Sequence, residues 1–235
     1  MRNKLALLFL IGMVVVVAGS RVRSTSRQQR LAELEASPDR DSLSWHAEVA
    51  KAKGEKRVSI PAPAVEPLDM SYTLDDALAE NSAVIAEPIE SVTKADGTDF
   101  VVSWYKFKAI DYLSRRSIPS GLNCSRAEAP RDLLPLQQDE FVVERYGGTL
   151  TINDVLIKMY DASFPPFELH RRYLLLVSQC PSGVGVLCGG PVGVFKVNND
   201  DALESAGGQF HPITEAMKTQ FGSSVHFLRD HLSHA

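Results

Sequence analysis

The sequence has few cysteines and lacks the short motifs that catalytic and metal sites commonly carry. Its 235 residues include three cysteines, and no two of them form a C-x-x-C pair. This excludes thioredoxin-type redox motifs and ribbon-type zinc sites. The G-x-S-x-G pattern of a nucleophile elbow is absent as well. Residues 198–201 are acidic, but their surroundings lack the spacing of an EF-hand calcium loop, so we expect a turn and helix cap there.

An excess of positive charge is also missing from most of the chain. Residues 58–235 hold 14 Lys and Arg against 23 Asp and Glu. Nucleic-acid binding needs a basic face that displaces counterions, so the composition argues against it. Residues 21–57 are the exception, with nine basic against six acidic residues. This basic stretch favours either contact with anionic lipid head groups or an ordinary solvated helix.

Long hydrophobic runs are rare, and the clearest one stands near the N-terminus. Residues 5–19 are uncharged and mostly apolar, behind Arg2 and Lys4. A helix of this length spans about 22 Å, which is short for a bilayer core and typical of a signal peptide. Small residues allow cleavage after Ser20, but Arg21 follows directly and disfavours it. The sequence therefore predicts export, and leaves open a cleaved signal peptide or a single-pass membrane anchor over residues 1–20.

Composition divides the rest of the chain into three parts. Residues 21–57 are polar and helix-prone, which predicts a neck of short helices or a partly disordered spacer. Residues 58–69 contain several prolines and predict an extended linker. Residues 70–235 are long enough for one domain with its own core.

Hydrophobic patterns within residues 70–235 alternate mainly with a period of two. Thr73 predicts the cap of a short helix, Asp96-Gly97 predicts a hairpin turn, and Pro88 predicts an edge or bulge in its strand. Strands are expected over residues 83–92, 100–113, 140–146, 173–178 and 193–197, with a long loop over 114–137, a strand or short helix over 149–159, and helices from Pro212 onward. We therefore expect a mainly β (α+β) fold, best described as a small closed or partly open antiparallel barrel with short flanking helices, preceded by the N-terminal hydrophobic helix.

The three cysteines allow one disulfide in an exported protein. Cys180 and Cys188 enclose a turn-rich stretch between two apolar segments, which favours a hairpin closed by a Cys180–Cys188 bridge. Pairings that use Cys124, or three reduced thiols, remain alternatives. The glycines of residues 183–190 resemble a phosphate loop only in spacing. A strand rather than a helix follows them, so a structural hairpin loop is the favoured interpretation.

The order of several segments resembles a group of exported bacterial domains of unknown function. The matching segments are residues 73–86, residues 104–110, Gly147-Gly148, residues 166–177 and residues 190–197. His170 stands where those domains usually have glycine. That group is similar to OB-like barrels, including the netrin and metalloproteinase-inhibitor type, and this resemblance agrees with the barrel of about five strands that the pattern predicts. The inhibitors use an N-terminal cysteine to chelate metal, and this chain has Arg21 at that position, so the resemblance carries no inhibitory activity.

Several residue groups are candidates for chemistry, and each also has an ordinary structural interpretation. They are Cys188 with His170 or His211 as a nucleophile and base; His226, His231 and His234 with Asp230 as metal ligands; Arg171-Arg172 with Arg115-Arg116 as an anion site; and Trp104, Tyr105 and Phe107 as a binding face. In each group the structural interpretation is favoured. We therefore assign no catalytic, cofactor or metal residues.

The sequence thus favours an exported or membrane-tethered protein with a non-catalytic binding or scaffold domain. The expected partner is another envelope or surface protein, with membrane contact through the N-terminal segment. An extracytoplasmic hydrolase or metal-dependent enzyme using His170, His211 and Cys188 is the alternative.

Overall fold

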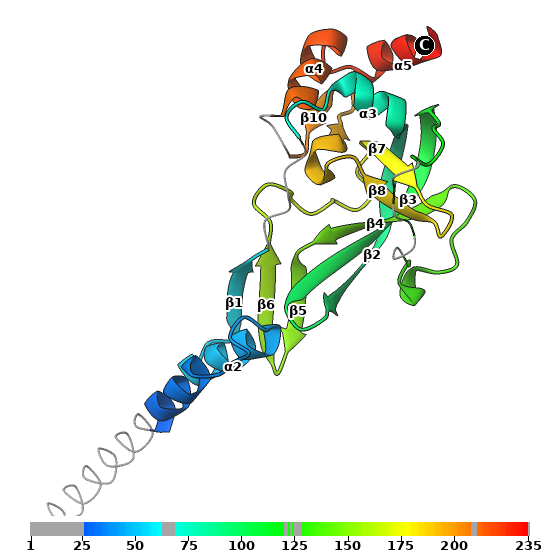
Figure 1. Cartoon of the computed structure of the whole chain (residues 1–235). Coiled ribbons are helices and arrows are strands. Elements are labelled where there is room, and N and C mark those ends of the chain that lie inside the picture. Colours follow the sequence, from blue (N-terminus) through cyan, green and yellow to red (C-terminus); the bar gives the residue numbers. More distant parts are fainter. Residues whose placement is uncertain are drawn as a thin grey trace, which may run out of the picture. The chain divides into compact units, whose positions relative to one another are not determined.

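The computed structural model describes residues 26–62, 69–119, 122, 124, 128–207 and 211–234 (Figure 1). These residues form two compact units. One comprises residues 26–59, Gly97–Asp99 and Leu150–Lys158; the other comprises the described residues within Ile60–Asp96, Phe100–Thr149 and Met159–Ala235. The predicted N-terminal helix over residues 1–20 lies outside the described residues. Within them, no helix is both long enough and apolar enough to cross a membrane.

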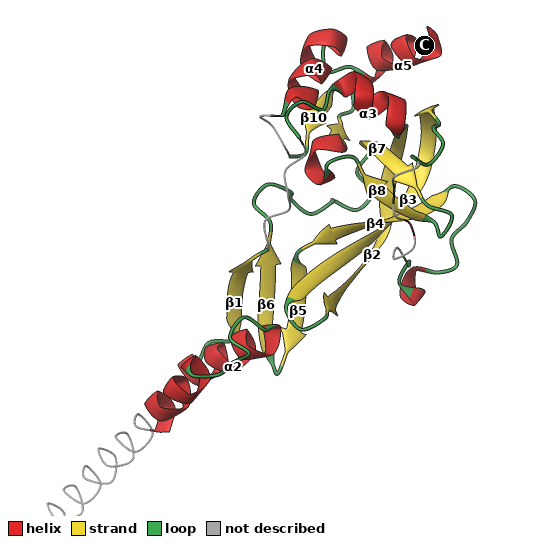
Figure 2. Cartoon of the chain, viewed as in Figure 1, coloured by secondary structure: helices red, strands yellow, loops and turns green. Residues whose placement is uncertain are grey.

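The larger unit contains a closed five-stranded barrel (Figure 2). Its strands are β2 (Ser82–Asp96), β3 (Phe100–Ser114), β4 (Glu140–Tyr146), β7 (Tyr173–Gln179) and β8 (Val184–Leu187). They pair in the order β7-β2-β3-β4-β8, and β8 closes the barrel by pairing with β7. Every pair is antiparallel except β4 with β8, which is parallel and departs from the fully antiparallel barrel expected. Beyond β7, the sheet continues into β9 (Val194–Val197) and β10 (Leu203–Ser205).

The long hairpin of β2 and β3 forms as the sequence predicts. Gly97 adopts the positive φ of 62° that the turn after Asp96 requires. A register shift between Pro88 and Glu90 is the predicted irregularity at the proline. Odd-numbered residues of β3 from 101 to 109 are all buried.

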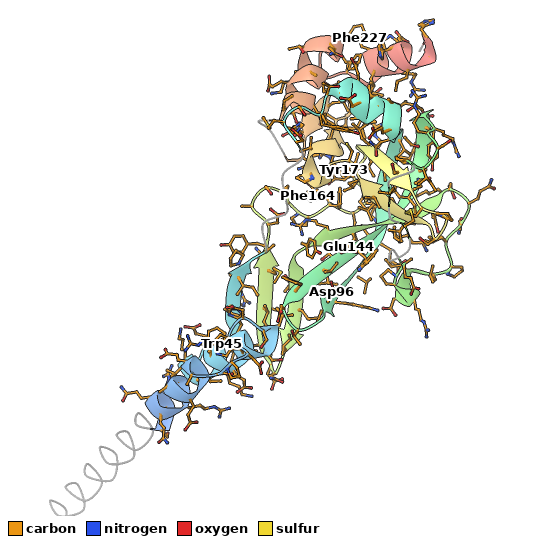
Figure 3. All side chains as sticks on the ribbon, viewed as in Figure 1. Trp45, Asp96, Glu144, Phe164, Tyr173 and Phe227 are labelled. Atoms are coloured by element: carbon orange, nitrogen blue, oxygen red, sulfur yellow. A yellow bond between two sulfur atoms is a disulfide. The ribbon has the colours of Figure 1, made fainter. Side chains whose placement is uncertain are left out.

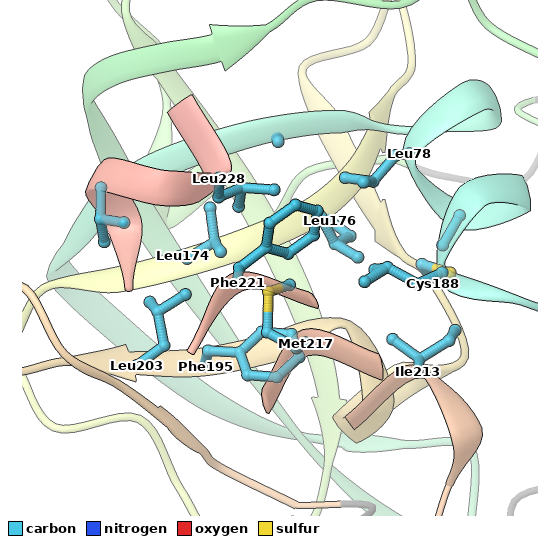
Figure 4. Close-up of a cluster of buried hydrophobic side chains, with 14 of the residues drawn as sticks. Leu78, Leu174, Leu176, Cys188, Phe195, Leu203, Ile213, Met217, Phe221 and Leu228 are labelled. Atoms are coloured by element: carbon cyan, nitrogen blue, oxygen red, sulfur yellow. The ribbon is translucent and has the colours of Figure 1, made fainter. Parts of the chain in front are cut away.

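Strand β7 is apolar along its whole length because it separates two hydrophobic cores. Tyr173, Leu175 and Val177 point into the barrel, where Phe107 stacks on Phe141 at 5.6 Å between ring centroids. The opposite face of β7 carries Leu174 and Leu176, which belong to a second core under the helices (Figure 4). Burial on both faces explains why no alternation is visible in this strand.

Three helices cover that second core. They are α3 (Leu74–Glu80), α4 (Pro212–Phe221) and α5 (Val225–His234). Thr73 caps α3 in a reciprocal capping box with Asp76, which confirms the predicted start of this helix. Pro212 occupies the first turn of α4, where its missing N–H costs nothing. Leu78, Met217 and Leu228 bring the three helices into one apolar cluster.

The disulfide joins Cys124 to Cys180, and Cys188 is a free, buried thiol. The favoured Cys180–Cys188 pairing is therefore corrected. The hairpin register explains why: the Cys180 N–H bonds to the carbonyl of Val184, whereas the Cys188 N–H bonds to that of Leu176. Cys188 thus lies beside a residue four positions before Cys180, a separation of about 13 Å along a strand. A disulfide spans Cα atoms less than about 7 Å apart.

The loop before β4 packs on the outer side of the barrel. It contains the short 3-10 helix η2 (Arg131–Leu133), whose Leu133 is buried against Val142 of β4 and Val184 of β8. The structure thus confirms the absence of long elements in the described part of residues 114–137, and it gives this loop a hydrophobic contact of its own.

The smaller unit contains the polar neck. Residues 26–35 are helical, and α2 (Leu43–Lys53) begins at the cap Ser42. The Trp45 indole donates to the carbonyl of Leu34 at 2.8 Å, and Arg30 bonds Glu48 at 2.7 Å, which together join the two helices. The part of the neck that the structure describes therefore contains the short helices that its composition favours.

A three-stranded sheet falls mostly in the same unit. It is ordered β1 (Arg57–Pro61), β6 (Val155–Tyr160) and β5 (Gly148–Ile152). Residues 58–61, expected as part of an extended linker, thus lie in strand β1. Residues 149–159, where a strand or a short helix was expected, contribute to two strands. Asn153 and Asp154 make the turn between them with positive φ. Strand β6 pairs with β1, and β5 pairs with β6, so residues 150–158 group with the neck.

Candidate functional site

The parallel pair β4–β8 is the shortest ladder of the barrel. It consists of Val142 beside Val184 and Val143 beside Gly185. Both strands continue beyond this point, but the ladder ends before the bond that would join the Leu187 N–H to the carbonyl of Glu144. The seam that closes the barrel therefore opens into a fork.

Hydrogen-bond alternation shows which backbone groups of β4 face this fork. The N–H of Gly147 bonds to Val101 of β3, whereas the N–H of Val142 bonds to Gly183 on the opposite side. Odd-numbered residues of β4 thus bond to β3 and even-numbered residues face away from it. The Glu144 carbonyl and the Tyr146 N–H consequently point into the fork.

The same reasoning applies to β8. Val184 and Cys188 bond to β7 at the two ends of the hairpin, so even-numbered residues of β8 face β7. Leu187 therefore directs its backbone groups to the other side, toward β4. No strand pairs with β4 or β8 on this side beyond Val143 and Gly185 in the part of the chain that the structure describes.

A cleft of about 280 Å³ lies at the fork. It is lined by Glu144, Arg145 and Tyr146 of β4, by Val184, Gly185, Val186 and Leu187 of β8, by Asp161 and Phe164 of the loop after β6, and by Gly190 and Pro191 of the 3-10 helix η3 (Gly190–Gly193). Figure 3 labels Glu144 and Phe164 on two of these segments. The cleft thus combines apolar side chains with two unpaired strand edges.

Arg145 forms the inner wall of the cleft and is only 4% exposed. Its Nε donates to the carbonyl of Phe164 at 2.8 Å, and its Nη2 donates to the same oxygen. Burial lowers the pKa of Arg145, while nearby Tyr105 and Asp161 oppose that effect. The guanidinium therefore holds the loop after β6 against the barrel.

Asp161 fixes the same loop from its other end. Its Oδ1 accepts hydrogen bonds from the backbone N–H groups of Ser163 and Phe164 and from the Ser163 hydroxyl, at 2.8, 3.1 and 2.6 Å respectively. This arrangement is an Asx-type turn, in which a carboxylate replaces a backbone acceptor. The loop wall of the cleft is thus positioned by two charged residues, Asp161 and Arg145.

Glu144 differs from Arg145 and Asp161 because its side chain does not hold the loop wall in place. It is exposed and stands opposite Trp104 on β3, and among the described residues it makes no hydrogen bond or ion pair. Although the surface of Glu144 is exposed, desolvation by the protein atoms around its carboxyl group raises its pKa, and the charge of Asp96 on β2 raises that pKa further (Figure 3). A cation placed beside Glu144 would offset both effects.

Among the described residues, neither His170 nor His211 makes a hydrogen bond with Cys188. The His211 ring caps α4 by accepting from the Ile213 N–H, and its other nitrogen lies 3.3 Å from the carbonyl of Asp69. His170 occupies a positive-φ position, 63°, in the turn before β7, where its N–H bonds to Pro88. Both histidines therefore have structural roles in the residues described.

Cys188 also lacks the setting of a catalytic thiol. Burial raises its pKa to about 11; the neighbouring Tyr72 lowers that value slightly and Glu80 raises it. Tyr72 itself donates to Glu80 at 2.7 Å. A nucleophilic cysteine needs a lowered pKa, so this environment favours the neutral thiol.

The remaining sequence candidates are also dispersed. Arg171 and Arg172 bond to Asn198. Arg116 bonds to the Leu78 carbonyl, and Arg115 stacks on Tyr112. These contacts do not assemble the candidate anion site.

The candidate metal ligands near the C-terminus have other contacts. His226 pairs with Asp230, and His231 contacts Phe221. Within the described residues no three metal-ligating side chains gather. Tyr105 and Phe107 are buried in the barrel core.

Sequence reasoning missed the cleft because it treated residues 181–187 as loop. Those residues contain β8, the strand that closes the barrel. The short apolar run Val184-Gly-Val-Leu could have predicted this strand, but Gly183 and Gly185 favoured a loop. No family model matches the chain, and no curated protein or solved structure gives a match.

Proposed function

We propose that this is an exported or membrane-tethered protein whose β-rich domain binds an extended segment of another envelope or surface protein. The segment enters the cleft at the β4–β8 fork and pairs with the free strand edge there. The observation that supports this function lies beside an apolar cleft: the Glu144 carbonyl, the Tyr146 N–H and the Leu187 backbone groups have no strand partner in the described part of the chain.

Strand addition fits this geometry because its affinity comes from main-chain hydrogen bonds and its selectivity from neighbouring pockets. The cleft volume, 280 Å³, is near the lower end for small-ligand pockets. A few residues of the partner therefore enter it, and the rest of the segment lies outside.

The proposed location rests on the sequence. The apolar run of residues 5–19 and the basic stretch behind it support export with a position at or near a membrane. The closed five-stranded barrel is the class of fold that the OB-like resemblance implies, and barrels of that kind commonly bind extended ligands across one face. Both points favour a binding domain over an enzyme.

Photo-crosslinking of the full chain in its native membrane or secreted fraction tests this function. A photoreactive amino acid replaces Val186, which lines the cleft; in the control it replaces Glu204, an exposed residue of β10 outside the cleft. We expect the Val186 probe to label one continuous segment of a single partner protein. Equal labelling from both positions, or labelling of unrelated proteins, would contradict the proposal.

A further inference from the structure

The charges around the cleft are unbalanced in one direction. Arg145 is the positive group of the lining, and its Nε and Nη2 both donate to the Phe164 carbonyl. Asp161 and Glu144 are the negative groups, and Asp96 adds to the potential at Glu144. The carboxylate that remains free to interact with an incoming ligand is therefore that of Glu144.

We infer that the extended segment bound in the cleft carries a lysine or arginine that pairs with the Glu144 carboxylate. This inference rests on the proposed strand addition and specifies the chemistry of the partner. Two observations favour a positively charged ligand group. Locally, Glu144 and Asp96 are both negative. Over residues 58–235, 23 acidic side chains outnumber 14 basic ones.

The geometry of strand pairing places the cation. Residues directly opposite on paired strands have their side chains on one face, with Cβ atoms about 5 Å apart. A segment that pairs along the Glu144–Tyr146 edge therefore carries one side chain beside Glu144. The cleft walls reduce solvent screening there, so an ion pair at this position contributes more than a fully exposed one.

A random library of 12-residue peptides tests the inference on the full chain. The library is selected against the wild type, against Glu144→Lys, and against Glu204→Lys, which makes the same charge change on an exposed strand position outside the cleft. A fourth protein, Val186→Trp, obstructs the cleft. Val186 also lines a second pocket, so a fifth protein, Leu122→Trp, obstructs that pocket alone, and peptides lost only with Val186→Trp are assigned to the cleft. Thermal unfolding of all five proteins verifies that each is folded.

The expected result is enrichment of Lys or Arg at one position of the selected peptides. Those peptides bind Glu144→Lys about tenfold or more weakly, bind Glu204→Lys with near-unchanged affinity, and fail to bind Val186→Trp. Selection against Glu144→Lys should instead enrich Asp or Glu at that position.

Two other outcomes separate the inference from the function it rests on. Peptides that require an open cleft but show no preference for a basic residue would overturn the cation pairing and leave strand addition standing. Selection that yields no peptide sensitive to Val186→Trp would overturn both.

Discussion

Arg145 on β4 and Phe164 in the loop after β6 are joined by two hydrogen bonds to a single carbonyl oxygen, with the Arg145 Cζ also 5.5 Å from the centre of the Phe164 ring. Phe164 is only 6% exposed. The contact therefore buries a charged group against a backbone acceptor that has little access to water. It connects the barrel to the loop that forms one wall of the cleft.

Arg145→Leu is expected to lower the free energy of unfolding by about 1–3 kcal/mol, because it leaves the Phe164 carbonyl buried without its donors. Urea unfolding measures this change. Arg229→Leu is the control: Arg229 makes an exposed ion pair with Asp111, so its loss should cost less than about 1 kcal/mol. Equal effects of the two substitutions would contradict the role of Arg145.

Gly185→Ala tests the packing of β8 against the barrel core. A Cβ at this position would lie 2.8 Å from a methyl carbon of Val177 and 3.0 Å from a ring carbon of Phe141. Overpacking of this kind is expected to cost about 1–3 kcal/mol. Gly97→Asn is the control, because that turn has open space and asparagine tolerates positive φ. A stability equal to the wild type for Gly185→Ala would mean that β8 does not pack as described.

The disulfide predicts a specific thiol count. Under denaturing, non-reducing conditions one thiol per chain should react with iodoacetamide, because Cys124 and Cys180 are bonded. In the native protein that thiol, Cys188, should react slowly, since it is buried and its pKa is raised to about 11. Three reactive thiols in denatured protein from its native compartment would contradict the bridge.

Replacing both Cys124 and Cys180 by serine measures what the bridge contributes. The bonded residues are 56 apart in sequence, and closing a loop of this length is expected to stabilise the fold by about 4 kcal/mol. Urea unfolding of the double variant under non-reducing conditions provides the number. A change below about 1 kcal/mol would show that the unfolded chain gains little freedom when the bridge is absent.

Glu144 predicts a pH dependence with a definite sign. Its folded-state pKa is raised above the ordinary value of about 4.3, so the folded state binds more protons than the unfolded state between the two values. The contribution of Glu144 to stability is therefore lost as the pH rises through that window. Glu144→Gln removes the effect, so the difference in stability between variant and wild type should grow with pH and then level off. A difference that is constant with pH would contradict the raised pKa.

Local signals predicted the parts of the fold that local chemistry decides. Thr73 with Asp76 defined a helix start, and Asp96-Gly97 defined the turn of the long hairpin. In each case the determining residues are close together in the sequence.

Long-range pairing decided what the sequence left open. The disulfide depends on the register of β7 with β8, which places Cys188 beside Leu176 and away from Cys180. The cleft depends on where the parallel pairing of β4 and β8 stops, and no residue pattern marks that point. In the second sheet β6 pairs with β1, which is about 100 residues earlier in the sequence, and β5 pairs with β6.

Hydrogen exchange of single backbone amides, measured by NMR on the full chain with and without a peptide selected from the library, tests strand addition most directly. The Tyr146 and Leu187 N–H groups face the cleft, whereas those of Arg145 and Val186 face neighbouring strands. Strand addition predicts that the peptide slows exchange at one or both of the first pair and leaves the second pair unchanged. Binding of the peptide with unchanged exchange at both Tyr146 and Leu187 would contradict the account.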